Sequence, residues 1–289
     1  MASLDSITPA RAPTRPGTAG SADLVRRSGR IFTGDPARPQ AAALAVSAGR
    51  ITAVGDEADI AALAGLGTRV VDALGRCVIP GLNDSHIHLI RSGVNYLLEL
   101  RWDGVPALSL ALRMLREQAQ RTPPGHWVRV VGGRTGAQFA EKRLPTVSEL
   151  NAAPPDTPVL VLHLYQSAIL NRAAITALGY TKNTPDPPGW QIVRDHASSP
   201  TGVLLATPAP FILYGVLGRL PVLEPDQQVS FTRHFFGELN RFGITIAIDA
   251  VGGSQQFPGN YAAIMQLVRS GDLSVRIAYH LLPRTAGNE

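Results

Sequence analysis

The chain has a single cysteine, only two lysines and no long hydrophobic run among its 289 residues. One thiol, Cys77, cannot form an internal disulfide, which agrees with a reducing compartment, and its apolar neighbours Val78 and Ile79 predict that it fills the core. No apolar stretch approaches the roughly eighteen residues of a membrane-spanning helix, and residues 1–30 carry proline, arginine and serine where a signal peptide needs apolar residues. We therefore expect a cytoplasmic protein that does not interact with a membrane.

Acidic residues are outnumbered, which gives a net charge of +5 and a pI near 9.8. Much of the excess lies at the start of the chain, and the later arginines are scattered among acidic residues rather than clustered. No groove-reading or single-strand motif accompanies this charge, so we expect no nucleic-acid partner. The sequence also lacks a Gly-x-Ser-x-Gly nucleophile elbow, a phosphate-binding Gly-x-x-x-x-Gly-Lys loop and a cysteine pair for zinc.

Turn signals and apolar runs divide the chain into three parts. Residues 1–21 are rich in proline, alanine and serine without apolar periodicity, which predicts a disordered leader. Residues 22–76 hold short apolar runs separated by turns, which predict a small all-β module with a hairpin connection at Ala48-Gly49-Arg50. The remaining part, residues 77–289, is mixed in character.

That third part begins with an apolar run, Arg76 to Leu82, which predicts a buried strand. Beyond it, spacings of three and four residues predict helices, and continuous apolar runs predict buried strands of a parallel sheet. Their alternation favours an α/β fold with a TIM-like barrel. Residues 181–203 hold too many prolines and glycines for a helix or a central strand and are interpreted as an excursion or lid. The predicted helices are Ser109 to Gln120, Asn171 to Leu178, Asp226 to Arg241 and Asn260 to Arg269, and the strands are Trp127 to Val131, Pro158 to Tyr165, Ile244 to Ala250 and Ser274 to Leu282.

Two histidines, His86 and His88, follow the Pro80-Gly81 turn. Residues two apart on a strand point to the same face, roughly 7 Å apart along the backbone, so their imidazoles can converge on one metal ion. Imidazole is a common ligand of zinc and other first-row metals, and such an ion lowers the pKa of a bound water and polarises a carbonyl. The alternative is a pair of histidines that are satisfied by hydrogen bonds in the core.

The segment from Val78 to Leu89 resembles the signature of the amidohydrolase superfamily, and the runs before it look like that superfamily's N-terminal β-sandwich. Four later segments resemble, more narrowly, the amidohydrolase 3 group, which includes N-substituted formamide deformylases. Those segments are Leu144-Pro145-Thr146, Asn171-Arg172-Ala173-Ala174, Thr184-Pro185-Asp186-Pro187-Pro188-Gly189 and Gly202-Val203-Leu204.

This resemblance implies one or two divalent ions, usually zinc, with His86 and His88 as ligands. It also implies two further histidines and a water-activating aspartate in later barrel strands, and full-length members are much longer. Because this sequence ends at Glu289, we expect a C-terminally truncated barrel over 77–289, an N-terminal β-sandwich module over 22–76, and a catalytic aspartate outside this chain.

Gly243 to Asp249 looks like the superfamily's second barrel strand, which makes much of residues 100–240 a family-specific insertion and leaves three barrel strands. Counting every predicted strand gives five instead. Asp249 and His280, each at the end of a predicted strand, are further candidates for the metal or the mouth of the active site. Lys142 and Lys182 lie in loop-like surroundings, so neither is a good candidate for a metal-bridging carboxylated lysine.

The leading hypothesis is a hydrolase that attacks the C–N bond of a small amide or formamide with a metal-activated water. The alternatives are a truncated, inactive fragment, and a metal-binding module whose further ligands come from a partner chain. A homo-oligomer is therefore left open.

Overall fold

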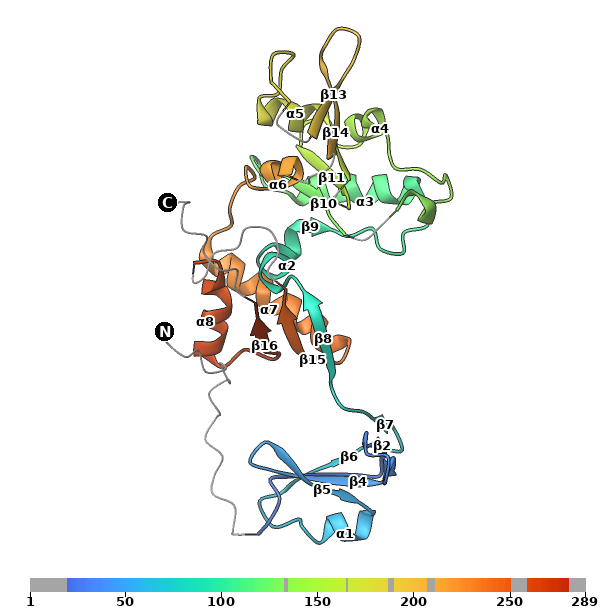
Figure 1. Cartoon of the computed structure of the whole chain (residues 1–289), viewed down its shortest axis with the longest axis vertical. Coiled ribbons are helices and arrows are strands. Elements are labelled where there is room, and N and C mark those ends of the chain that lie inside the picture. Colours follow the sequence, from blue (N-terminus) through green and yellow to red (C-terminus); the bar gives the residue numbers. More distant parts are fainter. Residues whose placement is uncertain are drawn as a thin grey trace. The chain divides into compact units, whose positions relative to one another are not determined.

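The structure is a computed structural model that describes residues 20–132, 135–164, 166–186, 190–206, 211–250 and 259–280 (Figure 1). The predicted leader lies almost wholly outside the described residues. The chain divides into two compact units with a mixed α/β fold: unit 1 comprises Met1–Leu89, Phe236–Val251 and Ile264–Glu289, and unit 2 comprises Ile90–Phe235 and Gly252–Ala263. No helix within the described ranges is long and apolar enough to cross a membrane.

The first part of unit 1 consists of two small sheets and one short helix. Its four-stranded sheet has the order β5-β4-β1-β6 and its three-stranded sheet the order β3-β2-β7. Strands β4 and β5 form the predicted hairpin, in which Ala48 and Gly49 take φ values of 52° and 74°, the left-handed conformation that a two-residue hairpin turn requires. The elements are β1 (Leu24–Arg27), β2 (Arg30–Phe32), β3 (Gln40–Ala41), β4 (Ala43–Ser47), β5 (Arg50–Gly55), α1 (Glu57–Ala61), β6 (Arg69–Asp72) and β7 (Cys77–Val78).

The prediction that Cys77 fills the core is wrong, because its side chain is exposed. Strand β7 has only two residues and lies at the edge of its sheet, where it pairs with β2 alone. Ile79, which follows it, is 57% exposed. The apolar run from Arg76 to Leu82 is therefore an edge strand and a connection rather than a buried strand, since an edge position leaves one side of the backbone uncovered.

The second sheet of unit 1 has three parallel strands in the order β16-β15-β8. They are β8 (Leu82–Ile87), β15 (Ile244–Asp249) and β16 (Arg276–Tyr279). Helix α7 (Pro225–Arg241) precedes β15 along the chain and α8 (Ala262–Ser270) precedes β16, each close to its predicted bounds. The predicted strands around residues 128 and 160 belong to the six-stranded sheet of the other unit. The alternative in which all five predicted strands belong to one barrel sheet is therefore wrong for the described residues.

Unit 2 is built on a six-stranded sheet of order β13-β14-β12-β11-β10-β9. Strands β9, β10 and β11 are parallel, and the pairs β11–β12, β12–β14 and β13–β14 are antiparallel. The strands are β9 (Glu99–Leu100), β10 (Val128–Val130), β11 (Val159–His163), β12 (Ser167–Leu170), β13 (Trp190–Arg194) and β14 (Pro200–Ala206). The helices of this unit include α2 (Leu89–Asn95), α3 (Leu108–Arg121), α4 (Val147–Ala152), α5 (Arg172–Leu178) and α6 (Phe211–Leu217), with short 3-10 turns at Tyr96–Leu98, Gly136–Gln138 and Gly259–Tyr261.

Both faces of this sheet are covered by apolar side chains. One cluster joins Val128 and Val130 of β10 to α3 and α4, and a second joins Leu160 of β11 to α5 and α6. Neighbouring residues on a strand point to opposite faces, so Arg129 belongs to the second face.

The interpretation of residues 181–203 as an excursion without a central strand is wrong. Strands β13 and β14 form a hairpin, and β14 lies between β13 and β12 inside the sheet. Pro185 lies before β13, and Pro200 and Gly202 lie in β14 itself. In the connection between the two strands, the Asp195 carboxylate accepts hydrogen bonds from the Ala197 and Ser199 amides. Pro200 opens β14, a position that proline tolerates because it leaves the later residues of the strand free to pair.

Candidate metal centre

Three strands bring the candidate ligands to one edge of the parallel sheet of unit 1. Asp249, at the end of β15, pairs with Ile87 of β8 on one side and with Tyr279 of β16 on the other. The amide of His280 donates a hydrogen bond of 3.0 Å to the Asp249 carbonyl. Because parallel strands end at the same edge, the segment from His86 to His88 and the residues Asp249 and His280 lie along one line of strand ends.

The two histidine rings lie close together, with centroids 5.6 Å apart and planes inclined by 67°. The Asp84 carboxylate accepts a hydrogen bond of 3.0 Å from the His86 amide, which orders the backbone at the start of the pair. His88 Nδ1 is buried and has no hydrogen-bond partner among the described residues. A buried imidazole nitrogen without a partner is costly unless something binds it, so the pair fits a metal ion that accepts nitrogen ligands.

Asp249 has a structural role at this edge of the sheet. Its side chain is fully buried, and its Oδ1 accepts a hydrogen bond of 2.8 Å from the Leu89 amide, at the first residue of α2. A carboxylate at a helix start satisfies an amide that has no partner within the helix. His280 is exposed. Within the described part of the chain, no three His, Cys, Asp or Glu residues are grouped closely enough to hold one metal ion, so the four candidates do not form a complete ligand set.

The start of β8 depends on a glycine. A Cβ atom on Gly81 would lie 2.1 Å from Oγ1 of Thr245, on the neighbouring strand β15. The Leu82 amide donates a hydrogen bond of 2.8 Å to the Gly243 carbonyl, which fixes the same end of the pair. Gly81 therefore lets β8 begin directly against β15, and the histidines follow at the opposite end of the strand.

A second site in unit 2 was missed by sequence reasoning. Arg129 interrupts the apolar run of β10, and its lateral neighbour on β9 is Glu99. Burial raises the pKa of Glu99, an effect that the nearby Arg91, Arg101 and Arg129 partly offset. Burial lowers the pKa of Arg129, and the negative charge of Glu99 partly offsets this by raising it. The available signal was a charged residue inside a strand with apolar residues on either side of it.

Residues 69–288 match the family model described as Amidohydrolase family. The chain belongs to this family. It is 31% identical over 231 residues to an N-substituted formamide deformylase of Arthrobacter pascens, covering 79% of this chain and 42% of that protein. It is also 34% identical over 185 residues to the protein LONG AFTER FAR-RED 3 of Arabidopsis thaliana, covering 64% of this chain and 31% of that protein. The chain thus spans less than half the length of these two relatives.

The fold of this amidohydrolase chain has counterparts among solved structures. An uncharacterized metal-dependent hydrolase from Pyrococcus horikoshii superposes with a TM-score of 0.59 at 21% identity, covering 89% of this chain and 48% of that one. A second, from Pyrococcus furiosus, gives 0.56 at 20% identity, covering 89% and 49%. At this level of identity the likeness concerns the mixed α/β fold.

Three segments that resemble the amidohydrolase 3 group have structural roles in unit 2. Thr146 caps α4 through a reciprocal pair of hydrogen bonds with Glu149. Asn171 is fully buried and joins the end of β12 to its surroundings through four hydrogen bonds. Gly202 takes a φ of +103°, and a Cβ on it would lie 2.5 Å from the carbonyl oxygen of Leu170. Asn171 and Gly202 therefore support the contacts of strands β11, β12 and β14, and Thr146 fixes the start of α4.

Proposed function

We propose that this chain carries the histidine pair of a metal-dependent hydrolase that acts on the C–N bond of small amides or formamides. The observation that carries the proposal is the buried, unpartnered Nδ1 of His88 in a ring 5.6 Å from that of His86. Membership of the amidohydrolase family supports it, as does similarity to a protein named N-substituted formamide deformylase. Zinc, as one or two ions, is the metal that we propose, because zinc prefers imidazole nitrogen.

The fold implied by this proposal is larger than the three-stranded sheet. We infer that β8, β15 and β16 are the first three strands of a TIM-like barrel, since they are adjacent, parallel and in chain order. We further infer that residues 22–76 form a β-sandwich module and that residues 100–240 are a family-specific insertion in the barrel of residues 77–289. Barrel enzymes place their reactive groups at the carboxyl ends of the strands, where His88, Asp249 and His280 lie.

Each residue at this edge has a separate task. His86 and His88 would hold the ion through neutral ring nitrogens, and the hydrogen bond from the His86 amide to Asp84 keeps the first of them in place. Asp249 holds the start of α2 through the Leu89 amide. A bound divalent ion supplies Lewis-acid chemistry, polarising the amide carbonyl and making water a better nucleophile near neutral pH. Asp249 and His280 remain proposed contributors.

Metal content tests the ligand pair directly. We expect the purified chain, at equilibrium with free zinc, to bind about one ion per chain. His86→Ala and His88→Ala should each reduce retained zinc strongly, because each removes one of the two ligands of a weakly coordinated ion. His126→Ala, which changes a half-buried histidine of unit 2, is the matched control and should retain as much zinc as the unchanged chain. Full retention by both ligand variants would contradict the assignment.

A second candidate function follows from the absence of a three-residue ligand group within the described ranges. On this alternative the chain binds a metal ion but does not hydrolyse amides. The two are separated by incubating the zinc-loaded chain with a panel of N-substituted formamides and acetamides and measuring the released amine. Zinc-dependent release that His88→Ala abolishes supports the hydrolase, whereas bound zinc without release supports the metal-binding module.

A further inference from the structure

Arg129 is a charged residue in the interior of the six-stranded sheet of unit 2. It lies in the middle of β10, between Val128 and Val130, and only 6% of it is exposed. On one side its neighbour across the sheet is Leu160 of β11, and on the other it is Glu99 of β9. Lateral neighbours in a sheet share a face, so the guanidinium lies at the boundary between an apolar core and one carboxylate.

The guanidinium of Arg129 is attracted by the neighbouring Glu99 carboxylate, but its hydrogen bonds to the described residues are incomplete. Its Nε is buried without a hydrogen bond. The side chain of Glu99 is 7% exposed, and its Oε2 accepts a hydrogen bond of 3.4 Å from Arg101 rather than from Arg129. A buried guanidinium whose donors are not all satisfied is costly, so an arginine at this position favours a further binding partner.

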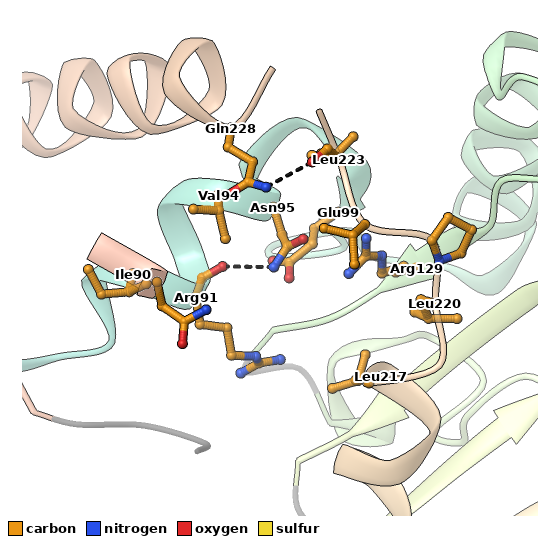
Figure 2. A pocket seen from close by; sticks show the side chains of 14 residues that line it. Ile90, Arg91, Val94, Asn95, Glu99, Arg129, Leu217, Leu220, Leu223 and Gln228 are labelled. Atoms are coloured by element: carbon orange, nitrogen blue, oxygen red, sulfur yellow. Dashed lines mark hydrogen bonds between the residues drawn. The ribbon is translucent and has the colours of Figure 1, made fainter. Parts of the chain in front are cut away.

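A cavity of about 400 Å³ opens beside this guanidinium (Figure 2). Its apolar wall comes from the end of α6 and the segment that follows, with Leu217, Leu220 and Leu223. Its polar residues include Arg91 and Asn95 of α2, and Asn95 Nδ2 is already engaged with the Arg91 carbonyl at 3.1 Å. Figure 2 shows Glu99 and Arg129 facing the same space as Leu220. The volume lies in the range of sites for small organic molecules, which are mostly apolar with a few polar groups.

The charges around the cavity define the ligand. Arg91 and Arg129 line it together with one acid, Glu99, so the cavity favours a single negative charge. A dianion would be repelled by the Glu99 carboxylate, which lies next to Arg129. A planar guanidinium binds a carboxylate through two parallel hydrogen bonds, and the leucine wall favours a hydrocarbon tail over bulk water.

We propose that this cavity binds a small organic monocarboxylate with an apolar tail, whose carboxylate is held by the guanidinium of Arg129. The site lies in unit 2, whereas His86 and His88 lie in unit 1, and it does not depend on the metal proposal. Ordered water alone is the competing occupant, because water can also satisfy a buried guanidinium.

Hexanoate and its neutral analogue hexanamide are suitable probes, because they share a tail and differ in charge. By titration calorimetry with the whole chain at neutral pH, hexanoate should bind at least about tenfold more tightly than hexanamide, as expected for hydrogen bonds to a charged group. Arg129→Met keeps the length of the side chain and removes the charge, so it should abolish this preference. Arg113→Met, which removes an exposed arginine of α3 that pairs with Glu117, is the matched control and should retain the preference.

A second variant keeps the test decisive if Arg129→Met does not fold. Val94→Trp adds bulk to the cavity wall without changing a charge, and it should weaken hexanoate binding by at least about tenfold if the ligand occupies this space. Two results would overturn the proposal: the absence of saturable hexanoate binding to the unchanged chain, which leaves water as the occupant, or equal binding of hexanoate and hexanamide. Unchanged binding to Val94→Trp would place the carboxylate elsewhere and would overturn it as well.

Discussion

Asn171 should be one of the most sensitive positions of unit 2. It is fully buried, and its Oδ1 accepts hydrogen bonds of 3.0 Å from the amides of Val159 and Ala174. Its Nδ2 donates to the carbonyls of Pro154 and Thr157 at 3.0 and 2.9 Å. Each such bond contributes about 1 kcal/mol, and the bond to Ala174 also caps α5. Asn171→Ala should therefore lower the free energy of unfolding by about 4 kcal/mol.

The assay uses the position of the tryptophans. All three tryptophans, Trp102, Trp127 and Trp190, lie in unit 2, so fluorescence during urea unfolding reports on that unit. Asn151→Ala is the matched control, because Asn151 Oδ1 accepts a single hydrogen bond, from the Arg172 amide at 2.7 Å. It should cost about 1 kcal/mol. If Asn171→Ala costs no more than Asn151→Ala, the four-bond reasoning is refuted.

Two further predictions use the same unfolding assay. The Arg143 guanidinium beside Glu149 lowers the pKa of that carboxyl from 4.5 to about 2, so Glu149 stabilises the folded chain above about pH 5 and this contribution is lost as the pH falls towards 2. Glu149→Gln should cost about 1 kcal/mol at pH 7, a value that allows for solvent screening, and close to nothing at pH 2, whereas a cost independent of pH would contradict this cause. Gly202→Ala should cost about 2 kcal/mol or more, because its φ is +103° and the new Cβ would meet the Leu170 carbonyl. Gly215→Ala, in open space on α6, is its control and should be neutral or slightly stabilising, and equal effects of the two changes would refute the steric argument.

Local patterns predicted the elements well where one periodicity dominates. The helix predicted at Ser109 to Gln120 is α3, which spans Leu108–Arg121, and the strand predicted at Ile244 to Ala250 is β15, which spans Ile244–Asp249. Both are long enough to show a repeating apolar pattern. The prolines and glycines of residues 181–203 spoke against a central strand, so β13 and β14 were not predicted. The sequence alone does not show which of these residues lie in turns and which lie in strands.

The candidate site was only partly predictable. The spacing of His86 and His88 predicted that their side chains approach each other, and the ring distance of 5.6 Å agrees with it. The sequence could not predict the hydrogen bond that Asp249 accepts from the start of α2, because the two residues are 160 positions apart in the chain. Arg129 was missed because the residues around it predicted an ordinary apolar strand. Its role as a candidate binding residue depends on the neighbouring cavity and on Glu99 of the adjacent strand, which the sequence does not show.

The hydrogen bond between Asp249 and Leu89 joins residues 160 positions apart, and the pairing of β8 with β15 spans nearly the same separation. Closing a loop of that length in an unfolded chain has a large entropic cost and slows folding. A folded unit 2 replaces most of that loop with a rigid body, which shortens the segment that must find its partner. The order of folding events should therefore run from the inserted unit to the parallel sheet, so that the histidine pair reaches its final geometry late.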